Sequence, residues 1–218
     1  MKKIFLLASL ALGLMTSCQK EDFVAESVKN NPDFAVTATL DEALETRTQL
    51  SDKDNNGYKT LWTANDVISI FNAGSHYKYV INDGARELIA IFKYDPSFGN
   101  VTGGIEDEAS SDVFVSVYPF AQETTVSKSG DDYVVNTVIP TAQKHVTGSF
   151  GQDAAPMVAV NKTTPSFSFK NVASVLIMPL KGEGTIVSAT LESKAHKIAG
   201  KAVVTAAAAN LYPYSKCR

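Results

Sequence analysis

The amino-acid sequence predicts an all-β protein whose sheets pack face to face as β-sandwiches. Short segments that alternate between apolar and polar residues recur along the 218-residue chain, and turn-forming residues separate them. Almost no segment has the 3.6-residue spacing of an amphipathic helix. Thr, Val, Ser and Ala are abundant, which is typical of a strand-rich protein.

The first predicted strand covers residues 34–40, where Phe34, Val36, Ala38 and Leu40 share one face. Such strict alternation predicts a strand that is buried on one side. The run from Asp52 to Gly57 is rich in Asp and Asn and predicts a turn. The next predicted strands are 58–62, 67–71, 77–81, 88–94, 113–118, 133–139, 157–160 and 166–169.

The last part of the chain predicts an incomplete second unit. Residues 172–180 are almost wholly apolar and predict a strand buried on both faces, and residues 186–191 and 202–207 predict two more strands. A sandwich that starts at residue 163 has only about 55 residues, too few for a sizeable core. We therefore expect a complete N-terminal β-sandwich at 33–162 and a truncated or frameshifted partial β domain at 163–218. The alternative is one compact protein whose last strands complete a sheet.

The first residues resemble a lipoprotein signal. Two lysines precede an apolar stretch of about twelve residues, a length that suits a secretory signal and is too short to span a bilayer. Small residues and then Cys18 follow it, as in a lipobox. This resemblance implies a signal peptide at 1–17, acylation of Cys18, and a polar tether at 18–32. Two or more acyl chains give stable anchoring, so outer-membrane lipid is the expected partner. The alternative is an ordinary cleaved signal.

The residues directly after Cys18 sharpen this expectation. The sequence Gln19, Lys20, Glu21, Asp22 resembles a sorting signal that sends lipoproteins to the outer face of the outer membrane in a group of Gram-negative anaerobes. We therefore expect a lipid-anchored, surface-exposed protein. The alternative is a generic charged tether.

Composition and motifs do not favour a nucleic-acid-binding protein, a metalloprotein or an enzyme. The net charge is −3 with no basic patch, so no nucleic-acid partner is expected. His76, His145 and His196 do not have metal-ligand spacing, so no metal site is expected. Neither a nucleophile elbow nor a phosphate-binding glycine loop is present, and we expect no enzymatic activity and no cofactor. Cys217 has no cysteine partner once Cys18 is acylated.

An ordered set of landmarks follows the lipidation signal. Arg47 lies in Glu-Thr-Arg-Thr, and Trp62 and Asp66 belong to Leu-Trp-Thr-Ala-Asn-Asp-Val-Ile-Ser-Ile-Phe. The later landmarks are Val117–Phe120, Pro140-x-x-Gln143, Ala154–Met157, Phe169–Val172 and Ile198–Gly200. With these landmarks in this order, almost the whole chain resembles the fimbrillin family, in particular its Mfa-like branch.

The resemblance implies transthyretin-like β-sandwich domains and a surface lipoprotein that serves as a structural, tip or anchor subunit of a pilus (fimbrium) in cell adhesion. In well-understood members a protease cuts after an arginine near the end of the first strand. The strand is lost, and a strand from the next subunit fills the groove. By position, Arg47 is the candidate cleavage site, and other pilus subunits are the expected partners. The alternative is that Arg47 is a solvated surface residue and the first strand stays in place.

A second function stays open, a monomeric surface lipoprotein that binds glycan or a host protein. Phe71, Tyr77 and Tyr79 could form an aromatic ligand-binding strip on one strand pair, whereas a packed sheet face is the alternative that we favour. Trp62 is the only tryptophan, and we expect it to anchor the core rather than to form an exposed ligand platform.

Overall fold

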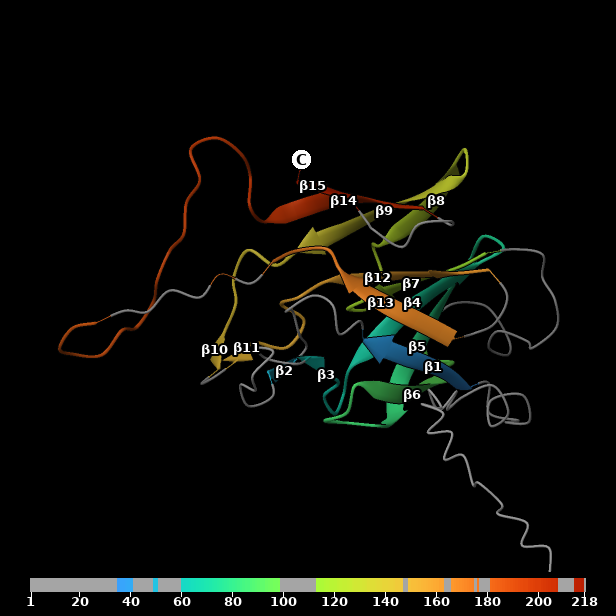
Figure 1. Ribbon diagram of the computed structural model, residues 1–218, viewed down its shortest axis with the longest axis horizontal. Coiled ribbons are helices and arrows are strands. Elements are labelled where there is room, and N and C mark those ends of the chain that lie inside the picture. The colour runs from blue at the N-terminus through green and yellow to red at the C-terminus, as the bar shows by residue number, and fades with distance from the viewer. Residues whose placement is uncertain are drawn as a thin grey trace, which may run out of the picture.

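The protein is described by a computed structural model that places residues 35–40, 49–50, 60–98, 113–146, 149–162, 166–174, 176, 181–207 and 214–217. Within these ranges the chain consists of strands and connecting segments, without a helix (Figure 1). No helix long and apolar enough to cross a membrane is found among them. The all-β prediction is confirmed for this part of the chain.

Seven strands form a closed sheet. Around the closed sheet, in spatial order, they are β1 (Ala35–Leu40), β13 (Ser166–Asn171), β12 (Met157–Asn161), β7 (Phe114–Tyr118), β4 (Val67–Asn72), β5 (Ser75–Asp83) and β6 (Ile89–Tyr94). The sheet closes because β6 pairs with β1. The pair β1–β13 is parallel, whereas the other pairs of this sheet are antiparallel.

A separate four-stranded sheet lies over the β7–β12 side of the closed sheet (Figure 1). Its strands, in spatial order, are β15 (Tyr214–Cys217), β14 (Gly200–Ala207), β9 (Asp132–Ile139) and β8 (Thr125–Ser129). Two short pairs complete the described strands, β2 (Gln49–Leu50) with β3 (Thr60–Leu61) and β10 (His145–Val146) with β11 (Ser149–Phe150).

Strand β7 is buried along its whole length because both of its faces are covered. Phe114 and Tyr118 point into the closed sheet, where they join its core. Val115 and Val117 point the other way and pack under the four-stranded sheet. We call this second cluster the valine layer; its buried members are Val115, Val117, Val135, Val158, Val172, Val204 and Ala206. Small, β-branched side chains of this kind suit two sheets that pack closely.

Strands from both sides of residue 163 share the same sheets. Strand β13 pairs with β12 and β1, and β14 pairs with β9 along eight register positions from Gly200 to Ala207. The C-terminal segments thus complete sheets that the N-terminal segments begin. How the chain divides into domains stays a prediction.

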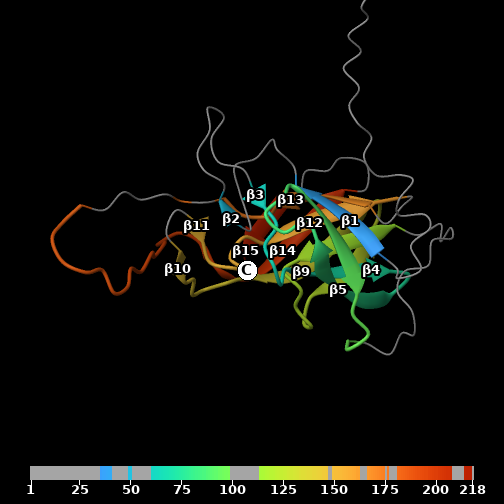
Figure 2. The same ribbon diagram turned by 90° about the horizontal axis from the view of Figure 1, so that it is seen from below.

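The predicted strand at 186–191 is wrong. Residues 181–199 run between β13 and β14 without a strand, and the side chains of 181–198 are exposed. The segment projects from the sheets as an extended loop (Figures 1 and 2). Alternation gives a segment two different faces, but a strand also needs a neighbour for its backbone, and none of the described strands lies beside it. The predicted buried strand at 172–180 is wrong where it is described, because residues 172–174 and 176 form no strand and Leu176 is 62% exposed. Residues 175 and 177–180 lie outside the described residues.

Candidate functional site

The first strand fills a gap between two other strands of the closed sheet. β1 pairs in parallel with β13, from Thr37 opposite Ser166 to Leu40 opposite Phe169. On its other side it pairs antiparallel with β6, from Ala35 opposite Lys93 to Thr39 opposite Ile89. Both edges of β1 are therefore satisfied. Without β1, the edges of β6 and β13 would carry unpaired N–H and C=O groups.

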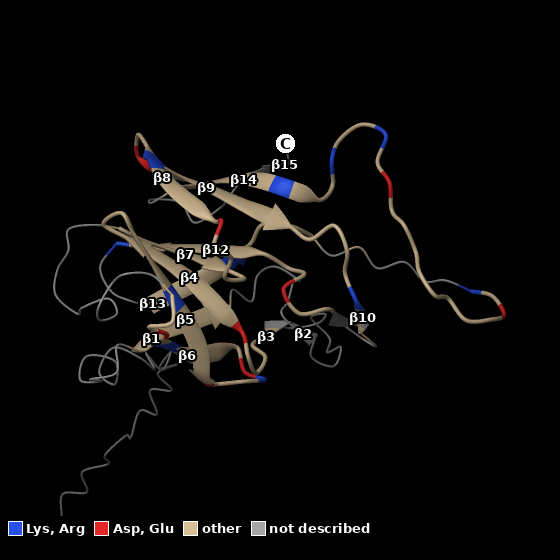
Figure 3. Ribbon diagram, turned by 180° about the vertical axis from the view of Figure 1, so that it is seen from behind, with Lys and Arg blue, Asp and Glu red and all other residues tan. Residues whose placement is uncertain are grey.

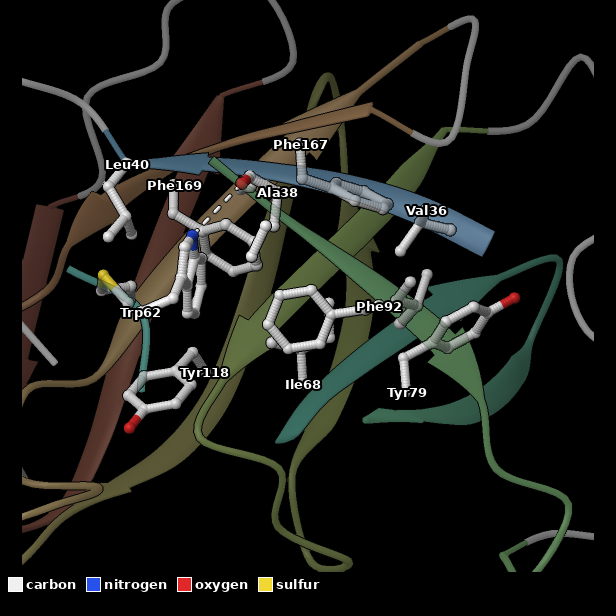
Figure 4. Close-up of a cluster of buried hydrophobic side chains, with 14 of the residues drawn as sticks. Val36, Ala38, Leu40, Trp62, Ile68, Tyr79, Phe92, Tyr118, Phe167 and Phe169 are labelled. Carbon is white, nitrogen blue, oxygen red and sulfur yellow. Dashed lines mark hydrogen bonds between the residues drawn. The ribbon is translucent and has the colours of Figure 1, made fainter. Parts of the chain in front are cut away.

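The inner face of β1 supplies part of the core of the closed sheet. Val36, Ala38 and Leu40 are buried and point toward the aromatic side chains beneath them (Figure 4). Those aromatic side chains include Trp62, Phe92, Phe167 and Phe169. Burial of a side chain the size of valine or leucine stabilises a fold by about 1.5–3 kcal/mol. Two such residues are a large share of the ~5–15 kcal/mol that ordinarily holds a domain together.

Trp62 lies directly under β1 and is fully buried. Its ring makes edge-to-face contacts with Phe92 at 5.0 Å, Phe169 at 5.4 Å and Tyr118 at 5.8 Å between centroids. Its indole Nε1–H donates to the main-chain oxygen of Ala38 at 3.2 Å (Figure 4). A buried indole N–H needs such an acceptor. The expectation that Trp62 is a core anchor is confirmed.

A tight turn after Trp62 fixes the tryptophan. The buried carboxylate of Asp66 accepts hydrogen bonds from the Thr63 N–H at 2.6 Å, the Thr63 hydroxyl at 2.8 Å and the Tyr118 hydroxyl at 3.0 Å. Burial raises the pKa of Asp66, although these three hydrogen bonds oppose the rise. The main chain of Trp62 is held as well. Its main-chain N–H donates to the main-chain oxygen of Glu87 at 2.9 Å, and its main-chain oxygen accepts from the Arg86 N–H at 2.6 Å.

Tyr118 connects this turn to a third segment. Its hydroxyl donates to Asp66 and accepts from the Asp153 N–H at 3.3 Å. Burial, together with the nearby Asp66 and Asp153, raises the pKa of Tyr118. The phenol therefore stays protonated and donates a hydrogen bond to Asp66. Landmarks that are far apart in the sequence thus meet in one network behind β1.

The predicted lipidation and cleavage residues lie outside the described residues. Cys18, the sorting residues Gln19–Asp22 and Arg47 therefore stay predictions. In the sequence, Arg47 lies between the end of β1 and the start of β2. A cut there would separate β1, and everything before it, from the rest of the chain.

The three aromatic residues of the open alternative do not form one exposed strip. Tyr79 is fully buried and Tyr77 packs against the same core inside the closed sheet. Phe71 packs against the valine layer on the opposite face. It also stacks on His76 with 4.1 Å between ring centroids. The packed-face interpretation is confirmed for Tyr79, so Phe71, Tyr77 and Tyr79 do not share one exposed face.

His76 belongs to a cluster of aromatic rings at one end of the strand pair β4–β5. Besides Phe71, it contacts Phe98 at 4.7 Å and Phe120 at 5.5 Å between ring centroids. Its Nε2 lies 2.9 Å from the Ser69 hydroxyl. Burial lowers the pKa of His76 from 6.5 to about 4. Lys78 lies 5.6 Å from the Phe120 ring of this cluster and pairs with Asp95.

The histidines lie on different elements, His76 on β5, His145 on β10 and His196 in the projecting loop. Among the described residues, no three side chains of His, Cys, Asp or Glu gather as metal ligands.

Comparisons with known proteins found no match to family models, to curated proteins or to solved structures. The fimbrillin resemblance therefore rests on the ordered landmarks. Three of them, Trp62, Asp66 and Tyr118, form one hydrogen-bonded and packed unit under β1.

Sequence reasoning identified the inner face of β1 but missed the aromatic side chains beneath it. Phe92 on β6 and Phe167 and Phe169 on β13 line the site. Their alternation within the predicted strands 88–94 and 166–169 was a usable signal for one buried face. It carried no information about which strands are neighbours of β1.

Ala38→Leu should destabilise the protein by about 1–3 kcal/mol, because a larger side chain at this fully buried position must displace the Trp62 ring. Urea unfolding of the wild type and the variant measures the change. The control is Thr39→Val, at the half-buried next position on the other face of β1, which should change the free energy of unfolding less than A38L does. Equal stability of A38L and wild type would contradict the tight packing of β1 on the core.

His76 should make the protein less stable in mild acid. Because burial lowers its pKa in the folded state, protonation favours the unfolded state. Its contribution is fully present above pH 6.5 and is lost as the pH falls from 6.5 to about 4. In His76→Phe, the thermal midpoint should fall less over this interval, and the two curves should run parallel above pH 7. Parallel curves over the whole range would contradict the buried, neutral imidazole.

Proposed function

We propose that the protein is a lipid-anchored surface subunit of a fimbrillin-like pilus, in which it serves as a structural, tip or anchor subunit in cell adhesion. The observation that carries the proposal is the position of β1. This strand closes the seven-stranded sheet, contributes the inner row Val36, Ala38 and Leu40 to its core, and is followed in sequence by Arg47.

The closed sheet explains why an exchanged strand would bind strongly. Once β1 leaves, β6 and β13 present two free backbone edges, and a row of apolar side chains loses its cover. A strand donated by a neighbouring subunit satisfies both needs, through main-chain pairing on two sides and through inward side chains at every second position. Because the core loses several kcal/mol without a strand, the groove strongly favours an occupant.

A cut at Arg47 would also make cut copies and uncut copies of the chain suited to different roles in the pilus. The candidate anchor, acylated Cys18, lies on the same side of Arg47 as β1. A cut copy loses its covalent link to the lipid together with β1 and can become part of a polymer. An uncut copy keeps both, which suits a subunit that anchors the pilus at the outer membrane.

The proposal includes the transthyretin-like fold that the resemblance implies. What supports it is the face-to-face packing of the four-stranded sheet on β7 and β12 through the valine layer. The closure of the larger sheet by β1 would then be the feature that strand exchange opens.

The test is the intact mass and the native-gel pattern of protein recovered from the outer membrane. The wild type should yield a chain that starts at Thr48, in a ladder that heat dissociates. Arg47→Ala should yield a chain that starts at lipid-bearing Cys18 and runs as a single monomer band. Arg86→Lys is the control. Arg86 is exposed in the turn between β5 and β6, and this variant should keep the ladder. A wild-type protein that starts at Cys18 and forms only monomers would contradict the polymer proposal.

A further inference from the structure

The loop between β13 and β14, residues 181–199, exposes large apolar side chains to solvent. We call this segment the arm, and it extends away from both sheets (Figures 1 and 2). Val187 is 93% exposed, Ile186 is 64% exposed and Leu191 is 54% exposed. A partner that covered these three side chains would remove apolar surface from water, which is favourable.

The centre of the arm, residues 186–191, makes no backbone hydrogen bond within the part of the chain that the structure describes. No charged residue lies between Glu183 and Glu192, so the arm has a neutral, strand-prone centre with charged ends (Figure 3). A lipid surface would cover the apolar side chains but leave the backbone groups unpaired. A groove at the edge of a sheet would both cover the apolar side chains and pair the backbone groups.

The centre of the arm repeats the sequence of β1. Residues 186–191 read Ile-Val-Ser-Ala-Thr-Leu, and residues 35–40 read Ala-Val-Thr-Ala-Thr-Leu, with four of six positions identical. All three inward positions of β1 are among the identical ones. The inward pairs are Val36 and Val187, Ala38 and Ala189, and Leu40 and Leu191. An acidic residue follows each segment, Asp41 after β1 and Glu192 after the arm segment.

We propose that residues 186–191 of one copy are the donor strand that fills the β1 groove of a second copy. This inference rests on the proposed function, because the groove opens only when β1 leaves. In the register of β1, Ala189 takes the place of Ala38 over Trp62, and its main-chain oxygen accepts the indole N–H. Val187 and Leu191 take the places of Val36 and Leu40 in the core.

The match at Ala38 is the most restrictive part of this fit. That position has no exposed surface, and the Trp62 ring and its hydrogen bond lie directly beneath it. A larger side chain there would overfill the core. The arm has alanine at this position and larger apolar residues on either side at the spacing of two, as the groove requires.

The first experiment compares arm variants in the outer-membrane assay. Val187→Asp should abolish the ladder while the chain still starts at Thr48, because an aspartate cannot enter the core of the second copy. Ile198→Asp is the matched control on the same arm, outside the repeated segment, and should keep the ladder. Both side chains are exposed in the single copy, so the thermal midpoint should stay unchanged in both variants. Ladders from V187D that equal those of the wild type would overturn the donor assignment and leave the proposed function intact.

The second experiment tests the fit without relying on assembly in cells. The purified full chain with Arg86→Lys, which removes the other internal arginine, is cut at Arg47 with an arginine-specific protease and mixed with a labelled peptide of residues 184–193. The peptide should displace β1 and remain bound, with the emission of Trp62, the single tryptophan, kept at the short wavelength of a buried indole. A peptide of residues 33–42 is the positive control, and the 184–193 peptide with Val187→Asp is the negative one. Retention of the 33–42 peptide but not of the 184–193 peptide would overturn the inference.

A cut chain that becomes a stable monomer, with its own arm in its own groove, would also overturn the assignment to a second copy. The connection from the end of β13 at Asn171 to Ile186 is long enough for a crossover between parallel strands. Size-exclusion chromatography separates this monomer from a ladder. Failure of the proposed function appears differently, as a wild-type chain that keeps Cys18 and β1.

Discussion

The contact between Trp62 and β1 is the constraint on which the rest of the site depends. The indole fills the centre of the closed sheet, and its N–H has its acceptor in the backbone of β1. Any strand that closes this sheet must therefore supply a small side chain at the position above the ring and a carbonyl oxygen beside the indole nitrogen. The turn from Thr63 to Asp66, held by the Tyr118 hydroxyl, keeps the ring in place whichever strand lies over it.

Only one of the two cores of the molecule contains residues of β1. The interior of the closed sheet includes Val36, Ala38 and Leu40, whereas the valine layer contains no residue of β1. Strand β7 belongs to both, with alternate residues in each core. Removal of β1 would therefore open one core while the other, with the four-stranded sheet above it, stays packed. The proposed strand exchange requires this division, because the groove must stay formed after β1 leaves.

The sequence predicted the faces of the strands better than their neighbours. Period-two alternation correctly placed Val36, Ala38 and Leu40 on one buried face, and the single tryptophan was correctly expected in the core. The prediction that β1 is buried on one face alone is wrong, since Ala35 and Thr37 on its other face are buried too. The closure of the sheet could not be predicted, because the parallel pairing of β1 with β13 joins residues that are far apart in the chain. The segment 186–191 also shows that alternation does not reveal whether a neighbouring strand exists. Its alternation is as regular as that of β1, but the described residues provide no adjacent strand, and it remains an exposed loop. Alternation reports a buried face only when a partner exists to bury it.

Hydrogen–deuterium exchange of the amides of β6 and β13, before and after a cut at Arg47, tests the removable strand most directly. If β1 is a separable closing strand, the cut chain without a replacement should exchange quickly along the β6 and β13 edges that face β1. Strands β9 and β14 should stay protected, and a bound donor strand should restore slow exchange on β6 and β13. Unchanged protection of β6 and β13 after the β1 fragment has been removed would contradict the account, as would loss of protection in β9 and β14 at the same time.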